Sequence, residues 1–231
     1  MNEDINEKKR RNNLFELFEH IKSTGGTLVI GGDFFDFWFT YKFVIPSGYI
    51  NLIEQLAQLN LSGISIHYVL GNHDYWDLGY FKEKFGAHVY NSEMEFIHEK
   101  SKIQVAHGDG LLKNDYSYRF MRKIIRSKPF IFLFKNFHPD WGCKIAKSIS
   151  NTSERYHHHD NKSTEIKNEL LNYARVQWSL GYSTIMLGHY HQTGIIKENN
   201  NYLIFLGDWL RHFTVTRLDH NGWWQGNWKK I

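Results

Sequence analysis

The sequence predicts a globular α/β domain, and three observations carry that prediction. The chain has 231 residues with 42% apolar content, which is enough for one sizeable core. Segments with helical spacing alternate with short apolar runs. Five of those runs stop at loops rich in Asp, Asn and His. Ligands of α/β sheets bind beyond the carboxyl ends of the strands, so this pattern predicts a ligand site there.

The N-terminal half begins with a predicted amphipathic helix over residues 7–22, where apolar residues recur every three or four positions. A short apolar run at 27–30 predicts a buried strand that leads into the loop 31–33. Helical spacing returns at 49–59. Residues 64–70 are rich in β-formers and predict a second strand, which leads into the loop 71–74.

The C-terminal half repeats the same arrangement of a strand followed by a polar loop. Residues 103–106 predict a strand ahead of the loop 107–110, and residues 184–187 predict another ahead of the loop 188–191. The remaining predicted elements are a helix at 164–180 and strands at 202–206 and 213–218.

The segment from about 111 to 160 lacks this rhythm and is basic and aromatic. We interpret it as a helical lid inserted over the site, within a single domain that covers residues 1–231. The alternative interpretation is an ordinary helical hairpin with a solvated basic face.

Composition limits the partners that we expect. The formal net charge of +4 fits an anionic substrate or an anionic membrane surface and does not demand nucleic acid. The single Cys143 excludes an intramolecular disulfide framework, and no apolar run is long enough to span a bilayer. The charged N-terminus lacks the apolar region of a secretory signal. We therefore expect a cytoplasmic protein with peripheral contact to the inner membrane; its oligomeric state stays open.

The polar loops supply a candidate set of metal ligands. Taken singly, each is as well explained by a turn, a helix cap or a solvated surface residue. Together they offer one carboxylate, one amide oxygen and three imidazoles, and Mn²⁺, Fe²⁺ and Zn²⁺ accept such mixed ligands. The candidates are Asp33, Asn72, His107, His189 and His191. His73 follows Asn72 and could donate a proton to a leaving oxygen.

The ordered motifs GDFFD, GNHD, HGDG and GHYH resemble those of the calcineurin-like metallophosphoesterases over almost the whole chain. The resemblance implies a β-sandwich flanked by helices and hydrolysis with two divalent cations, Mn²⁺ first among them. It also implies that Asp33 bridges both cations, that Asn72, His107 and His189 complete one site, and that His191 belongs to the other. His73 would contact the scissile phosphate, and Asp74 would orient His73.

A narrower resemblance links the chain to the UDP-2,3-diacylglucosamine hydrolases. It lies in the segments DFWF after the first motif, GNHDYW, HGDG with Asp115 and Tyr116 downstream, and GDWLRHFT. These enzymes cleave a lipid-linked nucleotide sugar into UMP and 2,3-diacylglucosamine 1-phosphate, beneath a lid that receives acyl chains. Substrate contacts are then expected from Asp109, Asp115, Tyr116, Arg119, Arg122 and Arg155. The alternatives are a phosphodiesterase or phosphatase for soluble nucleotides and a catalytically silent metal-binding relative.

One motif of the resembling family is absent from the sequence. The family carries Asp-x-His on a first strand, and no Asp-x-His precedes the helix at 7–22. Without it, the second cation keeps only Asp33 and His191 of the expected ligands, so that site is expected to be incomplete. Three explanations stay open: an upstream segment outside this sequence, a single-metal or inactive relative, or replacement ligands such as Asp74 or one of His157, His158 and His159.

Overall fold

The structure is a computed structural model that describes residues 5–139, 142 and 163–231. Its helices are α1 (Ile5–Thr24), α2 (Ile50–Leu61), α3 (Tyr80–Phe85), α4 (Tyr116–Ile125), α5 (Lys128–Lys135) and α7 (Ser163–Ser179). Its strands are β1 (Thr27–Ile30), β2 (Ser65–Val69), β3 (His88–Tyr90), β4 (Glu93–His98), β5 (Ser101–Ala106), β6 (Thr184–Leu187), β7 (Thr193–Glu198), β8 (Asn201–Leu206), β9 (Thr214–Asp219) and β10 (Gly222–Asn227). Short 3₁₀ turns lie at Ser47–Tyr49 and Trp228–Lys230.

The strands form three sheets. Strands β1, β2 and β3 make a parallel sheet in that order, and β9 pairs with β10 in an antiparallel ribbon. The largest sheet has the order β4-β5-β6-β8-β7; its inner pairs β5-β6 and β6-β8 are parallel and its outer pairs are antiparallel. Strands β1, β2, β5 and β6, whose following loops carry the candidate ligands, therefore all belong to parallel pairs.

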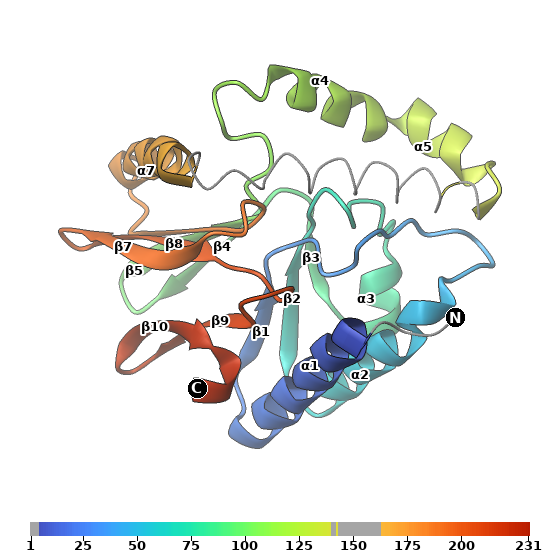
Figure 1. Cartoon of the computed structure of the whole chain (residues 1–231), viewed down its shortest axis with the longest axis horizontal. Coiled ribbons are helices and arrows are strands. Elements are labelled where there is room, and N and C mark those ends of the chain that lie inside the picture. Colours follow the sequence, from blue (N-terminus) through green and yellow to red (C-terminus); the bar gives the residue numbers. More distant parts are fainter. Residues whose placement is uncertain (1–4, 140–141, 143–162) are drawn as a thin grey trace.

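The layers follow from alternation of side chains along the strands. In β2, Ile66 and Tyr68 join a core with α1, α2 and α3, whereas Val69 joins a second core between the two larger sheets. In β6, Ile185 and Leu187 pack under α7, whereas Met186 faces the second core. Successive residues of a strand point to opposite faces of the sheet, so each of the two larger sheets buries both of its faces. The result is a two-sheet sandwich flanked by helices, with α4 and α5 lying above it (Figure 1). This confirms the predicted fold class.

Most predicted elements are present. The strands predicted at 27–30 and 184–187 have the predicted limits, and the other predicted helices and strands differ by a few residues at their ends. The insertion contains α4 and α5, and most of its remainder lies outside the described residues.

Five elements were missed by sequence reasoning: α3, β3, β4, β7 and β10. α3 and β3 are very short, and β10 reads GWWQGN, with a glycine near each end and no alternation of apolar residues. β4 places Glu93, Glu95 and His98 at exposed positions of a sheet edge. None of the helices among the described residues is long and apolar enough to cross a bilayer.

Candidate metal centre

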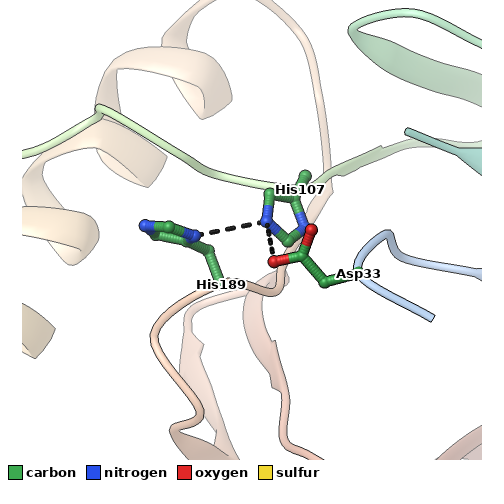
Figure 2. Close-up of side chains that lie close together, drawn as sticks. All are labelled: Asp33, His107 and His189. Carbon is green, nitrogen blue, oxygen red and sulfur yellow. Dashed lines mark hydrogen bonds and ion pairs between the residues drawn. The ribbon is translucent and has the colours of Figure 1, made fainter. Parts of the chain in front are cut away.

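Four of the five predicted ligands converge at the carboxyl ends of four strands. Asp33 follows β1, Asn72 follows β2, His107 follows β5 and His189 follows β6. The His107 Nε2 atom lies 3.1 Å from Asp33 Oδ2, 3.1 Å from Asn72 Oδ1 and 3.2 Å from His189 Nδ1. Figure 2 shows the two histidines and Asp33 pointing toward one another from three different segments.

This donor set fits a divalent cation. Ligand atoms of Asp33, His107 and His189 all lie within 4.8 Å of one another. Two ligands bound at about 2.0–2.3 Å from one cation are at most roughly 4.6 Å apart, so the three side chains need only small adjustments. Oxygen and imidazole donors together suit Mn²⁺, Fe²⁺ and Zn²⁺.

The loops reach this geometry through unusual backbone conformations. Asp33, His189 and His191 have φ values of 53°, 63° and 53°, in the left-handed region that side chains other than glycine rarely occupy. Gly32 has φ 92°, and a Cβ there would lie 2.5 Å from His107 Nδ1. A Cβ on Gly71 would lie 2.1 Å from Asp33 Oδ1. The glycines of GGD and GNHD thus let the loops approach each other closely, and left-handed residues of this kind cluster at functional sites.

His107 is fixed in one orientation by a backbone group. Its Nδ1 donates to the Gly31 carbonyl oxygen at 2.9 Å, which turns Nε2 toward the centre. Burial disfavours the charged ring, but the Asp33 carboxylate outweighs burial through its charge and its hydrogen bond. With Asp109 and the Gly31 carbonyl adding to the effect, the pKa of His107 rises to about 9. The same contact lowers the pKa of Asp33 against the effect of its own burial.

His73 lies beside Asp33 and His107, and one of its ring nitrogens is hydrogen-bonded to a backbone carbonyl. Its backbone N–H donates to Asp33 Oδ1 at 2.8 Å, and its Nδ1 donates to the Asp36 carbonyl oxygen at 2.6 Å. The Nε2 atom is thereby the one turned away from the backbone, and His73 lines the same groove as Asp33 and His107.

Asp74 serves the loop and does not orient the His73 ring. Its buried carboxylate accepts hydrogen bonds from Gly71 N at 2.7 Å, Phe34 N at 2.9 Å and Tyr68 Oη at 2.5 Å. Burial and the charge of Asp33 raise the pKa of Asp74 to about 6. The expected contact from Asp74 to His73 is not made: the His73 ring bonds to the Asp36 carbonyl instead, and the Asp74 carboxylate binds Gly71, Phe34 and Tyr68.

His191 lies near the centre without joining it. It lines the same groove, but among the described residues it makes no hydrogen bond to the other four. Enclosure by the groove lowers the pKa of His191, and the charges of Asp208 and Asp33 oppose that shift. Asp208 itself pairs with His212. The structure thus brings together the ligand set expected for the first cation. For a second cation, Asp33 and His191 are the expected ligands that lie near the centre in the described part of the chain, and that site stays a prediction.

Asp109 turns toward α4. Its Oδ2 atom accepts from Tyr118 Oη at 2.9 Å, from Arg122 Nη1 at 3.0 Å and from Arg126 Nη2 at 3.1 Å. Burial would raise the pKa of Asp109, but Arg126, His107 and Arg122 together lower it. Sequence reasoning missed Tyr118 and Arg126, although positions 118, 122 and 126 recur at the four-residue spacing of one helix face.

Of the other predicted substrate contacts, some bind groups of the protein itself and others lie exposed at its surface. Arg119 donates to the carbonyl oxygens of Gly110, Leu112 and Lys113, and its guanidinium lies 4.6 Å from the ring centre of the exposed Tyr116. These bonds fasten the start of α4 to the loop before it. A role of Arg119, Arg122 or Tyr116 toward substrate stays a prediction.

The remaining predicted substrate contacts are Asp115 and Arg155. Asp115 immediately precedes α4 and does not cap it with its side chain. Arg155 and the triple histidine at 157–159 lie outside the described residues.

The chain is similar to several known proteins. A UDP-2,3-diacylglucosamine hydrolase of Porphyromonas gingivalis (strain ATCC BAA-308 / W83) is 28% identical over 210 residues, which cover 84% of this chain and 80% of the relative. An enzyme of the same name from Histophilus somni (strain 2336) is 28% identical over 226 residues, 95% of each chain. A solved archaeal phosphodiesterase matches 93% of this chain and 90% of its own at 14% identity, with a TM-score of 0.45.

The family model for calcineurin-like phosphoesterases matches residues 4–193. That span includes all five candidate ligands and extends over well more than half of the 231 residues. The chain therefore belongs to the calcineurin-like phosphoesterase family and is a hydrolase of phosphoester bonds.

Proposed function

We propose that this hydrolase cleaves the diphosphate of UDP-2,3-diacylglucosamine. One water adds across the P–O–P linkage, and UMP and 2,3-diacylglucosamine 1-phosphate leave. The observation that carries the proposal is the convergence of Asp33, Asn72, His107 and His189 below a basic, apolar helix pair. Relatives that bear the name of this activity match most of the chain, which supports the same substrate.

The geometry supports the following proposed roles. Asp33, Asn72, His107 and His189 hold one divalent cation, with Mn²⁺ expected, and Asp33 and His191 contribute to a second. Bound divalent cations would polarise the phosphoryl oxygens and lower the pKa of the attacking water. His73 presents Nε2 to a phosphoryl oxygen, because Nδ1 is committed to the Asp36 carbonyl. The Gly31 carbonyl keeps His107 in the orientation that binding requires.

The surface above the site favours a lipid substrate over a soluble nucleotide. The segment from Tyr116 to Pro139 contains no Asp or Glu and six Lys or Arg residues. Large apolar side chains stand in solvent on both helices, among them Phe120 at 67% exposure and Phe132 at 69%. Basic groups attract phosphates and anionic head groups, and apolar side chains receive acyl chains. We therefore propose that the α4–α5 segment binds the acyl chains and contacts an anionic membrane surface.

A kinetic comparison tests the proposal. We expect the Mn²⁺-loaded enzyme to release UMP from UDP-2,3-diacylglucosamine with a kcat/KM at least roughly 100-fold above that for the deacylated UDP-sugar, because each buried CH₂ contributes about 0.8 kcal/mol. His107→Ala should lose Mn²⁺ binding and turnover together. Equal kcat/KM for both substrates would contradict the lipid assignment and favour a phosphodiesterase for soluble nucleotides.

A further inference from the structure

The C-terminal end of α4 is attached to the loop that carries His107. Arg122 and Arg126 both form ion pairs with Asp109, at 3.0 and 3.1 Å, and Tyr118 donates to the same carboxylate oxygen. Arg122 also donates to the Asp109 backbone carbonyl. Asp109 is two residues from His107, so these bonds hold the backbone of that loop as well as its side chain.

The same end of α4 is attached to a second loop. The Arg126 guanidinium stacks over Tyr75, 4.0 Å from the ring centre, and the Trp76 indole N–H donates to the Ile125 carbonyl at 3.0 Å. Tyr75 and Trp76 directly follow the GNHD loop that carries Asn72 and His73. A single residue, Arg126, therefore contacts the extensions of two loops that come from β2 and β5.

These contacts are enclosed. The Asp109 side chain is 8% exposed and that of Arg126 is 18% exposed. The Nε atom of Arg126 is buried and has no hydrogen-bond partner among the described residues. Without Arg126, the buried Asp109 carboxylate would keep Arg122 and Tyr118 but lose one of its two cations, and a buried charge that loses part of its compensation destabilises its surroundings. Surface ion pairs have no such consequence, because water replaces the lost partner.

We infer that Arg126 is a positioning residue, which together with Asp109 fixes the His107 loop and the Asn72–His73 loop at the separation that the metal centre needs. The inference rests on the proposed use of these side chains for cation binding and phosphoryl contact. It assigns to α4 a second role besides that of a lid: the helix end is a fixed support of the site.

Four variants test the inference. Arg126→Met removes both the charge and the guanidinium group, Arg126→Lys keeps the charge, and Asp109→Asn removes the partner. Ser117→Ala is a control at an exposed position of the same helix that has no role in binding. Three experiments are done on each variant: calorimetry gives Mn²⁺ affinity, amide hydrogen exchange is followed across residues 71–76 and 107–110, and kinetics give kcat and KM for bis(4-nitrophenyl) phosphate. This small diester has no acyl chain, so lid contacts with lipid do not affect it.

For Arg126→Met we expect Mn²⁺ affinity to fall roughly tenfold. This is the lower end of the loss seen when a residue that orients a metal ligand is mutated. Exchange should rise in both loops, and kcat should fall while KM stays within about twofold. Arg126→Lys should recover part of the loss. Arg126→Met combined with Asp109→Asn should lose less than the sum of the two single changes, because the two residues contact each other, while Asp109→Asn also weakens the contacts to Arg122 and Tyr118. Ser117→Ala should leave all of these measurements unchanged.

The inference is overturned if Arg126→Met, folded as judged by circular dichroism, changes exchange within α4 alone and keeps Mn²⁺ affinity within twofold. It is also overturned if Arg126→Met changes only the KM for the acylated substrate, because Arg126 would then be a substrate contact. Failure of the proposed function looks different: even a chain extended upstream, with Asp-x-His ahead of residue 1, would not release UMP from UDP-2,3-diacylglucosamine, while exchange and Mn²⁺ affinity still responded to Arg126→Met.

Discussion

The charge of His107 decides how the centre responds to pH. Burial lowers the pKa of this ring, and the Asp33 carboxylate more than reverses that effect, so the pKa rises to about 9 from an ordinary value of 6.5. A histidine whose folded pKa is raised stabilises the fold fully below the unfolded value, and this contribution is lost as pH rises through the folded value. The relevant window therefore runs from about pH 6.5 to about pH 9.

We predict that the melting temperature of the chelator-treated protein falls across that window. The raised pKa corresponds to at most about 3 kcal/mol, or roughly 5–10 °C for a chain of this size. Mn²⁺ should flatten the dependence, because a coordinating imidazole is already deprotonated. Differential scanning calorimetry at several pH values measures both curves. His107→Gln removes the titrating group and serves as the control; if this variant keeps the full slope, the dependence has another source.

A second residue-scale prediction concerns His73. His73→Ala should fold and bind Mn²⁺, because the bond to Asp33 comes from the His73 backbone and not from the ring. The turnover number should fall by roughly 10²–10⁴, the usual contribution of a proton donor or acceptor at the reacting group. Turnover of the acylated substrate and calorimetric Mn²⁺ binding are measured in parallel. A rate within twofold of the unchanged enzyme would remove His73 from the chemistry.

The sequence was sufficient to predict that the ligand residues lie close together. It was not sufficient to predict the hydrogen bonds and ion pairs that hold those residues in place. Asp33, Asn72, His107 and His189 each follow an apolar run, so their common position beyond the carboxyl ends of strands predicts a shared site, even though those strands belong to two sheets. The pairing of Asp109 with Arg126 depends on how α4 crosses the sandwich, and no local pattern encodes that crossing. For the same reason Asp74 was assigned to His73, its neighbour in sequence, whereas the fold supplies Tyr68 and Phe34 from elsewhere.

Elements differ in how clearly their sequences mark them. β6 is buried at all four positions and its apolar run has sharp limits, so its bounds were predictable. β4 and β10 gain their strand conformation from the neighbour that each pairs with, since their own residues are largely polar or glycine-flanked. Tertiary pairing outweighs local preference in such segments.

The α4–α5 segment gives an element-scale prediction. We expect the protein to sediment with vesicles containing phosphatidylglycerol and not with phosphatidylcholine vesicles, because the segment joins exposed apolar rings to an excess of basic residues. Phe120→Ser with Phe132→Ser should reduce the bound fraction several-fold, and high salt should reduce it further. Leu61→Ser is the matched control, since Leu61 is 85% exposed but lies at the end of α2. If Leu61→Ser has an equal effect, the α4–α5 segment is not the membrane contact.

At the scale of the whole molecule, two sheet edges face one groove. Within the described residues β1 pairs only with β2, and β9 pairs only with β10. Every residue of β1 and of β9 lines a groove of about 2840 Å³, which continues to the metal centre and to the apolar side of α1. Unpaired strand edges beside apolar surface are positions where another strand can pair.

We predict that an additional strand, entering ahead of α1, occupies this groove and joins β1 to β9. α1 runs beside β1 in the opposite direction (Figure 1), so a strand before α1 would lie parallel to β1 through a helical crossover. Its carboxyl end would then point toward Asp33 and His191, where an Asp-x-His sequence would add the two ligands that the second cation lacks.

The experiment compares the 231-residue chain with a chain extended upstream to the preceding start in the genome. The extended chain should bind two Mn²⁺ where the shorter one binds about one, because among the residues that the structure describes only Asp33 and His191 of the expected ligands are left for a second cation. Its melting temperature should rise, since the strand pairs two open edges and fills an apolar groove. Its turnover of UDP-2,3-diacylglucosamine should rise by orders of magnitude, because two-metal hydrolysis needs both charges. If the shorter chain binds two Mn²⁺ and turns over equally fast, the groove is not a strand site, and other residues of the 231 supply the second set of ligands.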